Sequence, residues 1–236
     1  MEHPFLFFVK LFEIIGNLFG SEAIIHFAHN SPHVIYSWVV MALLIILGAL
    51  AAKGISMVPT KAQNVSELIV SSMEEFMVEI TGEEGRWLFP LAGTIFLYVF
   101  IGNLIGLVPG FLPPTANLNT TVSCALVVFV FTHVIGIKYH GAGYIKHFLG
   151  PVWWMSPLIF VIEIIGHFAR ILSLSFRLFG NMMGHEIVLA ILFGLAGAFF
   201  APLPIMALGI FVSFVQGFVF FLLTVIYFSG AMEHAH

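Results

Sequence analysis

Charged residues are scarce in this sequence of 236 residues, of which only 8% are Asp, Glu, Lys or Arg and none is aspartate. Hydrophobic residues make up 60% of the chain, aromatic residues make up 15%, and the mean hydropathy is +1.07. A soluble protein of this length cannot bury so much apolar surface and also cover it with so few charges. The composition therefore excludes an ordinary water-soluble domain and predicts a protein embedded in lipid.

The sequence has a single cysteine and no excess of basic charge, and each of these features excludes a class of protein. The single cysteine, Cys124, lies in an apolar run, which excludes a disulfide framework and a thiolate metal site and leaves a packing role. The net charge of −4 and the pI near 6.2 give no electrostatic basis for binding nucleic acid. Lys10 and Glu13 interrupt the first apolar run, so we expect no cleavable signal.

Metal-binding patterns are weak as well. Three histidines have plausible ligand spacing but no acid or cysteine joins them, so a metal site there is a minority interpretation. They are His26, His29 and His33. The segment HEIVL lacks the second histidine of the zinc-protease motif HExxH. We therefore expect neither a metal nor a cofactor.

Long apolar runs are what the sequence does contain, and about 20 such residues cross a hydrocarbon core of ~30 Å. A first crossing is predicted in residues 33–54, a transmembrane hairpin in 87–139, and a long helical hairpin in 153–232. Residues 1–32 are expected to lie outside the membrane. The sequence thus predicts an all-α polytopic membrane protein with five crossings, which places its two ends on opposite sides.

An amphipathic helix is predicted in residues 60–84, where apolar side chains recur at three- and four-residue steps and glutamates occupy the opposite face. This helix is expected to pack on the protein's own loops or to lie on lipid. Lysines follow the first and third crossings, whereas the turn VPGFLPPTANLN has none; they are Lys53, Lys61, Lys138 and Lys146. The positive-inside rule then predicts that these loops, the amphipathic helix and the C-terminus are cytoplasmic and that the N-terminus is outside.

Ionisable residues concentrate in the fourth crossing, where an arginine near the helix centre costs about 2.5–3.5 kcal/mol and usually serves a function. At 100° per residue, one helix face is shared by Glu163, His167, Arg170, Arg177, Asn181 and His185. Glu186 lies about 13 Å beyond Arg177, and Glu163 lies about 21 Å before it. Arginine holds its charge whereas glutamate and histidine exchange protons, so Arg177 is interpreted as a barrier between two proton-accepting zones. The second and third crossings have no acid to pair with it, so its partner is expected nearby on its own helix or in another chain.

Structural interpretations of these residues remain open. His185 and Glu186 are compatible with a mutually satisfied buried pair, and Arg170 and Glu163 with extension toward the membrane interface. Gln216 in the last crossing suits a hydrogen bond between helices, because small residues that allow close contact flank it.

Four motifs, SLSFRLFGNMMGHE, QGFVFFLLTVIY, GNLIGLVP and PTANLNTT, closely resemble subunit a of the bacterial F-type ATP synthase membrane sector. The similarity extends over nearly the whole chain from the first crossing. It implies a stator subunit, no enzyme by itself, that packs against a rotating ring of c subunits and joins the b subunits of the peripheral stalk. The implied location is the bacterial inner membrane, in contact with lipid. A secondary ion antiporter is the alternative, although its usual inverted repeats with broken helices are not found.

The resemblance also implies roles for individual residues. Arg177 would face the ring carboxylate, and the last two helices would lie tilted along the ring. The remaining implied site residues are Glu186 and His185 in the outer half-channel, Glu163 in the inner vestibule, and Asn181 and Gln216 beside the arginine. Protons and sodium ions are both compatible with these residues.

Two positions depart from the family pattern. Many relatives have a histidine where this chain has Gly209, so the role of that histidine is assigned to His185 instead. Many also have an acid where this chain has Asn117. We therefore expect Asn103, Asn117 and Asn119 to line the outer entry only as neutral hydrogen-bonding groups.

Overall fold

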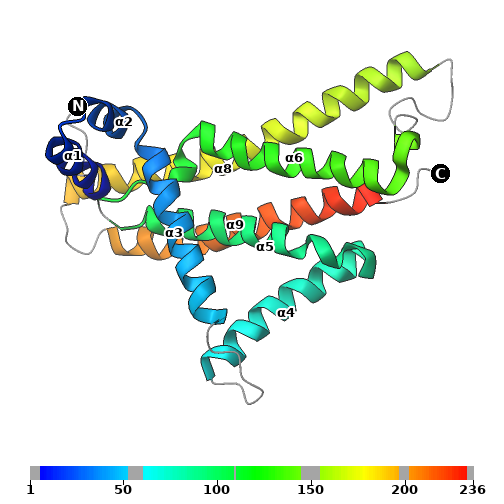
Figure 1. Cartoon of the computed structure of the whole chain (residues 1–236), viewed down its shortest axis with the longest axis horizontal. Helices are drawn as coiled ribbons and strands as arrows, with labels where there is room; N and C mark the ends of the chain where they lie inside the picture. Colours follow the sequence, from blue (N-terminus) through cyan, green and yellow to red (C-terminus); the bar gives the residue numbers. More distant parts are fainter. Residues whose placement is uncertain (1–5, 53–60, 109, 145–154, 197–201, 233–236) are drawn as a thin grey trace.

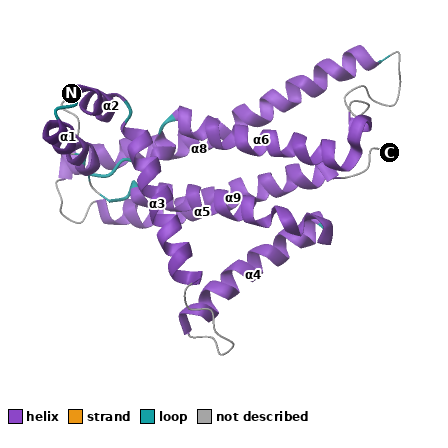
Figure 2. Ribbon diagram, viewed as in Figure 1, coloured by secondary structure: helices purple, strands orange, loops and turns teal. Residues whose placement is uncertain are grey.

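A computed structural model of the chain describes residues 6–52, 61–108, 110–144, 155–196 and 202–232 (Figure 1). Within these ranges every regular element is a helix (Figure 2). The helices are α1 (Phe7–Phe19), α2 (Glu22–Asn30), α3 (Pro32–Ala52), α4 (Lys61–Thr81), η1 (Glu83–Leu88), α5 (Phe89–Ile105), η2 (Pro114–Ala116), α6 (Leu118–His140), η3 (Gly141–Gly143), α8 (Ser156–Ala196) and α9 (Pro202–Met232). Five helical segments in the described ranges are long and apolar enough to cross a membrane, which confirms the predicted all-α polytopic fold.

Four of these helices form the main bundle. In Figure 1, α5, α6, α8 and α9 run side by side, and α5 packs on α9 while α6 packs on both α8 and α9. Their shared core is aromatic: Phe96 of α5 meets Phe221 of α9 edge to face at 6.2 Å between ring centroids. Phe221 is fully buried, so this contact holds α9 against the second crossing. The long final hairpin is therefore supported along one side by the helices that precede it.

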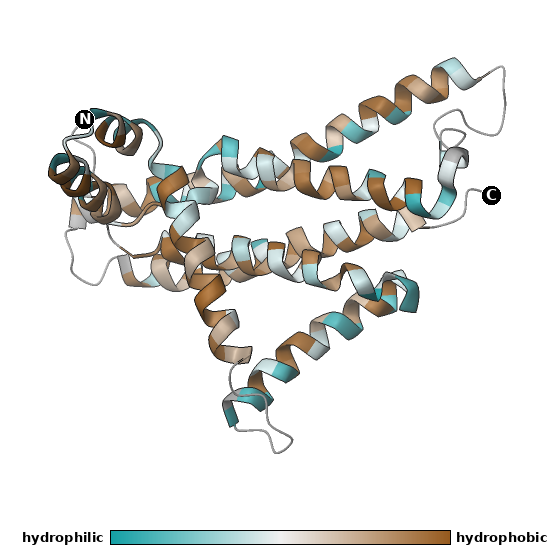
Figure 3. Cartoon of the chain, in the orientation of Figure 1, coloured by the Kyte–Doolittle hydropathy of each residue, from teal (hydrophilic) through white to brown (hydrophobic). Residues whose placement is uncertain are grey.

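Hydrophobic residues, brown in Figure 3, recur along the long helices, and many of their side chains are exposed on the outside of the bundle. Ile45 and Ile46 of α3 are 71% and 55% exposed, and Leu195 of α8 is 81% exposed. In water such exposure would promote aggregation, whereas in lipid it costs nothing. The distribution is that of a multi-pass membrane protein.

The two ends of the bundle differ in composition. One end, where the N-terminus lies in Figure 1, carries α1, α2 and the turn between α5 and α6. At the other end η1 carries Arg86, and Lys138 near the end of α6 lies beside it, with its Nζ 3.7 Å over the ring of Trp87. Of the four lysines used to predict the cytoplasmic side, Lys53 and Lys146 lie outside the described residues.

Residues 7–30 form the two helices α1 and α2, which lie at the turn between α5 and α6. The backbone N–H of Phe7 and the hydroxyl of Tyr36 both donate to the carbonyl oxygen of Gly110, at 3.3 and 3.1 Å. Gly110 adopts a φ of +89°, a conformation that glycine tolerates and other residues avoid. Phe111 then packs against Phe8 and Tyr36. The N-terminal segment is thereby tied to the turn between α5 and α6.

Helix α4 packs on α9 through its second half only. Met77 is fully buried there, and the hydroxyl of Ser229 on α9 donates to the carbonyl oxygen of Ile80 at 3.1 Å. Leu68 and Ile69, in the first half, are 66% and 52% exposed. The apolar face of this helix is therefore satisfied partly by the protein itself, and the rest remains exposed.

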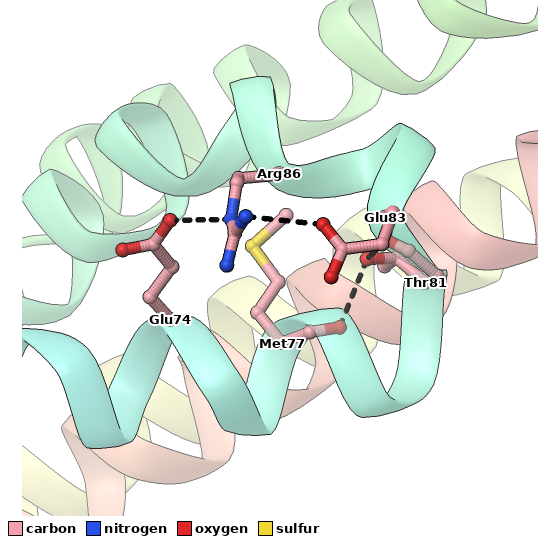
Figure 4. A network of polar contacts seen from close by, with 6 residues as sticks. Glu74, Met77, Thr81, Glu83 and Arg86 are labelled. Atoms are coloured by element: carbon pink, nitrogen blue, oxygen red, sulfur yellow. Dashed lines mark hydrogen bonds and ion pairs between the residues drawn. The ribbon is translucent and has the colours of Figure 1, made fainter.

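Arg86 holds the junction between α4 and η1 (Figure 4). Its Nε lies 2.8 Å from Glu74 Oε1, and its Nη1 lies 3.1 Å from Glu83 Oε2. The hydroxyl of Thr81 donates to the carbonyl oxygen of Met77 at 2.9 Å and closes the same corner. Because the arginine is more than half exposed, these pairs orient the corner rather than contributing much stability.

Candidate functional site

Arg177 lies near the middle of the 41-residue helix α8 and is exposed. Its neighbours Leu174 and Leu178 are only 3% and 0% exposed, so the arginine lies beside the buried face of the helix and not within it. Among the residues that the structure describes, it has no ion pair and no hydrogen bond. Apolar side chains surround it, with Phe176 53% exposed. The site thus presents one charge on an apolar surface.

Asn181 and Gln216 form a polar pair one turn further along. The Asn181 Nδ2 donates to Gln216 Oε1 at 2.8 Å, which links α8 to α9. Gln216 is buried and Asn181 is exposed on the same side as Arg177. The structure therefore brings these two predicted site residues together.

His185 occupies the space above Gly209 of α9. A Cβ atom added at Gly209 would collide with the His185 imidazole and with Leu107, which lies just after α5. The absence of a side chain at position 209 is what lets the imidazole approach the backbone of α9. The position that departs from the family pattern and the histidine to which its role was assigned are thus in direct contact.

Two buried polar atoms, one on α5 and one on α8, have no partner among the described residues. Asn103 of α5 is fully buried, and its Oδ1 accepts a hydrogen bond from the Thr115 hydroxyl at 2.5 Å. Its Nδ2 and the Nε2 of His185 are both buried and have no hydrogen-bond partner within the described part of the chain. Leu107, four residues after Asn103, lies beside Gly209 together with His185.

Glu186 is half-buried beside His185, and no hydrogen bond joins the two in the described ranges.

The asparagines near the turn between α5 and α6 make different contacts. Asn117 caps α6, because its Oδ1 accepts a hydrogen bond from the backbone N–H of Asn119 at 2.9 Å. Asn117 therefore has a structural role that the sequence did not predict.

Glu163 lies in a separate polar cluster toward the other end of α8. Its Oε1 is 3.8 Å from Nε2 of His167, and the Arg170 guanidinium lies over the ring of Tyr227 at 5.5 Å. Arg170 thus contacts α9 and is itself exposed. Tyr144, just beyond α6, also faces this cluster: burial raises the pKa of its phenol, the Glu163 carboxylate acts in the same direction, and Arg170 opposes both.

Sequence reasoning missed one member of this cluster. The imidazole of His133 on α6 lies 4.8 Å from that of His167, measured between ring centroids. The available signal was a histidine inside an otherwise apolar crossing, but its partner could be known only from the packing of α6 on α8.

The N-terminal histidines make separate contacts. His29 pairs with Glu13, and His26 contacts Asn30. No group of three potential metal ligands occurs in the ranges that the structure covers. Cys124 is partly buried and packs against the bundle core, as expected for a packing residue.

Comparison with known proteins gives consistent matches. A family model described as ATP synthase A chain matches residues 34–229. A protein named ATP synthase subunit a from Desulfosudis oleivorans is 72% identical over 236 residues, covering 100% of both chains. Proteins with the same name from Syntrophobacter fumaroxidans and Citrifermentans bemidjiense are 57% and 52% identical, again over 100% of both chains.

Proposed function

Because the chain belongs to the ATP synthase A chain family, a set of multi-pass, non-catalytic membrane components of ATP synthases, we propose that it is the stator that conducts ions to a rotating c-ring. One observation carries this proposal: the exposed Arg177 has no partner in the described part of its own chain and sits between two clusters of proton-exchanging groups. An arginine without a counterion on an apolar membrane surface is costly. A carboxylate on a neighbouring ring removes that cost.

The arginine would act on that carboxylate electrostatically. At a separation of about 4 Å and an effective dielectric near 20, the two charges attract by about 4 kcal/mol. This attraction favours the ionised carboxylate, so a ring carboxyl group approaching Arg177 releases its ion. Because the guanidinium does not give up its own proton, ions cannot pass directly from one side of it to the other.

The outer path is proposed to run past Glu186 and His185. Buried polar atoms in proteins nearly always have hydrogen-bond partners, and ordered water supplies them where protein does not. Within the described part of the chain the Nδ2 of Asn103 and the Nε2 of His185 have no partner, which fits a wetted path in which the Asn103 amide donates to water and the His185 nitrogen donates to or accepts from water. Ions would enter here, load a ring carboxylate, travel round with the ring and leave near Glu163.

Orientation and location follow from the same comparison and from charge. We place the end with Arg86 and Lys138 in the cytoplasm and the end with α1 and α2 outside a bacterial inner membrane. Each charge that crosses then gains ~2.3 kcal/mol per 100 mV of membrane potential. Contact with b subunits of the peripheral stalk belongs to the same proposal.

Gentle purification of the complex in detergent tests the proposal. The c-ring is expected to co-purify with this chain, and vesicles containing the complex are expected to acidify when ATP is added. A chain that purifies alone and exchanges ions without ATP would instead be an antiporter and would contradict the proposal.

Gly209→Ala is expected to slow ATP-driven transport, because the new methyl group must displace the His185 imidazole. We expect a loss of about tenfold, smaller than the roughly 10²–10⁴-fold contribution of a well-placed acid–base group, because the imidazole is displaced and not removed. The double variant His185→Gly with Gly209→His moves the imidazole to the facing helix and is expected to transport faster than Gly209→Ala. Dye-monitored acidification of vesicles measures both rates, and native rates for Gly209→Ala would contradict the proposed role of this contact.

A further inference from the structure

Two imidazoles meet at the contact between α6 and α8. The rings of His133 and His167 lie 4.8 Å apart between centroids and are tilted by 56°. The phenyl ring of Phe129 packs against both of them, at 4.1 and 5.8 Å. His167 is buried, whereas His133 is half-buried under the ring of Tyr144 at 5.9 Å. We call these two residues the inner histidine pair.

The hydrogen bonding of His133 determines which of its nitrogens exchanges a proton. Its Nδ1 lies 2.9 Å from the carbonyl oxygen of Phe129. A carbonyl oxygen can only accept, so Nδ1 carries the hydrogen and Nε2 is the nitrogen that gains or loses a proton. His167 presents its Nε2 to the Glu163 carboxylate at 3.8 Å. Each imidazole therefore has one ring nitrogen directed toward an oxygen acceptor, at 2.9 Å for His133 and 3.8 Å for His167.

A small cavity adjoins the pair between α6, α8 and α9. Its volume of about 20 Å³ is enough for one water molecule. Among its lining residues, Thr132, His167, Arg170 and Tyr227 bear polar groups. The Thr132 hydroxyl donates to the carbonyl oxygen of Val128 at 2.8 Å, which leaves its oxygen able to accept a hydrogen bond from water. A water held here would touch the imidazole of His167.

The inner histidine pair also lies between two charged residues of α8, Glu163 and Arg177. His167 is four residues from Glu163 and ten from Arg177, or about 6 and 15 Å along the helix. The other titratable or charged groups that face it, within the described residues, are Tyr144 beyond α6, Glu163 and Arg170 on α8, and Tyr227 on α9. Among them Glu163 attracts an added proton and Arg170 repels it, so no more than one imidazole is expected to be charged at a time.

From this arrangement we propose that the inner histidine pair is a proton relay on the cytoplasmic path, and that the ion carried is therefore the proton. This rests on the proposed stator function. A proton released near Arg177 binds one imidazole, the imidazolium passes it to the other imidazole or to the Glu163 carboxylate, and the donor returns to its neutral form. Hard cations such as sodium prefer oxygen ligands, so an imidazole pair conducts protons and not sodium.

Two substitutions test the relay while preserving local hydrogen bonding. In His133→Asn the amide nitrogen can still donate to the Phe129 carbonyl, and in His167→Gln the amide can still face Glu163, but neither amide exchanges protons. Inverted vesicles stripped of the catalytic sector expose the cytoplasmic face, and a potassium diffusion potential then drives proton flux that a dye reports. Each variant is expected to lower this flux by at least about tenfold. Each is also expected to flatten its dependence on cytoplasmic pH between about 5 and 8, where histidine titrates, and to leave the dependence on the other side unchanged.

Phe129→Leu is the matched control, because it removes a ring contact with both imidazoles but no titratable group. Its dependence on cytoplasmic pH is expected to remain that of the native protein. The relay is overturned if both histidine variants retain the native flux and pH profile, if Phe129→Leu changes the pH profile in the same way, or if ATP drives sodium uptake without proton movement.

Failure of the relay can be told apart from failure of the proposed stator function. Arg177→Ala is assayed in parallel, together with co-purification of the c-ring. Normal histidine variants beside an inactive Arg177→Ala overturn only the relay. An active Arg177→Ala overturns the stator mechanism on which the relay rests.

Discussion

Replacement of Arg177 by alanine is expected to abolish coupled transport while the complex still assembles. The arginine is exposed and makes no hydrogen bond or ion pair in the described part of the chain, so its removal leaves no buried partner unsatisfied. What disappears is an attraction of about 4 kcal/mol toward a ring carboxylate, equivalent to about a thousandfold in the release of its ion. ATP-driven acidification of vesicles measures the loss, and recovery of the c-ring on purification measures assembly.

The same variant should also leak. Without the fixed charge, ions can move between the two paths without turning the ring, so we expect passive proton flux across stripped vesicles to rise. Arg177→Lys is the informative companion, because an ammonium group keeps a positive charge but can lose its proton in apolar surroundings. We expect it to restore little coupling. Coupled synthesis at native rates in Arg177→Ala would contradict the mechanism.

Glu186→Gln is expected to slow transport by about ten- to a hundredfold and to change its dependence on the pH outside the membrane. Glutamine keeps the size and hydrogen bonding of the side chain but cannot carry a proton. Because Glu186 is half-buried beside His185 at the outer path, the change should affect loading of the ring and leave release near Glu163 as it was. Rates measured while the pH is varied on one side at a time separate these two steps.

The matched control for this prediction is Glu75→Gln, an identical replacement at an exposed glutamate of α4. It is expected to leave both pH profiles intact. If Glu186→Gln also shows the native profile on the outer side, Glu186 is not a proton carrier.

Hydropathy and run length predict the five crossings because a bilayer demands about 20 consecutive apolar residues, and few other constraints can produce such runs. The N-terminal segment contains no apolar run of this length, because Lys10 and Glu13 interrupt it. Helix α1 is held by contacts such as the hydrogen bond from the backbone N–H of Phe7 to the carbonyl oxygen of Gly110, which joins residues far apart in the sequence. Contacts at that separation cannot be read from local periodicity.

The residues of the candidate site likewise fall into those that the sequence alone indicates and those whose partners only the structure reveals. Arg177, Glu163 and Glu186 stood out in the sequence because a charge inside a crossing is expensive and therefore conspicuous. His133 did not stand out, because a neutral imidazole costs little and its meaning depends on His167 of another helix. The link between His185 and Gly209 likewise required the positions of both backbones, although the family resemblance, confirmed by the comparisons, pointed to this pair.

The tie between the start of the chain and the turn after α5 bears on how the protein is made. Phe7 and Tyr36 leave the ribosome long before Gly110, which supplies the carbonyl oxygen that both of them need. Chains are synthesised from the N-terminus, so this tie can close only after the turn between α5 and α6 has been made. A chain halted before residue 110 would lack the one carbonyl oxygen that Phe7 and Tyr36 share, and its first helices would be without this anchor.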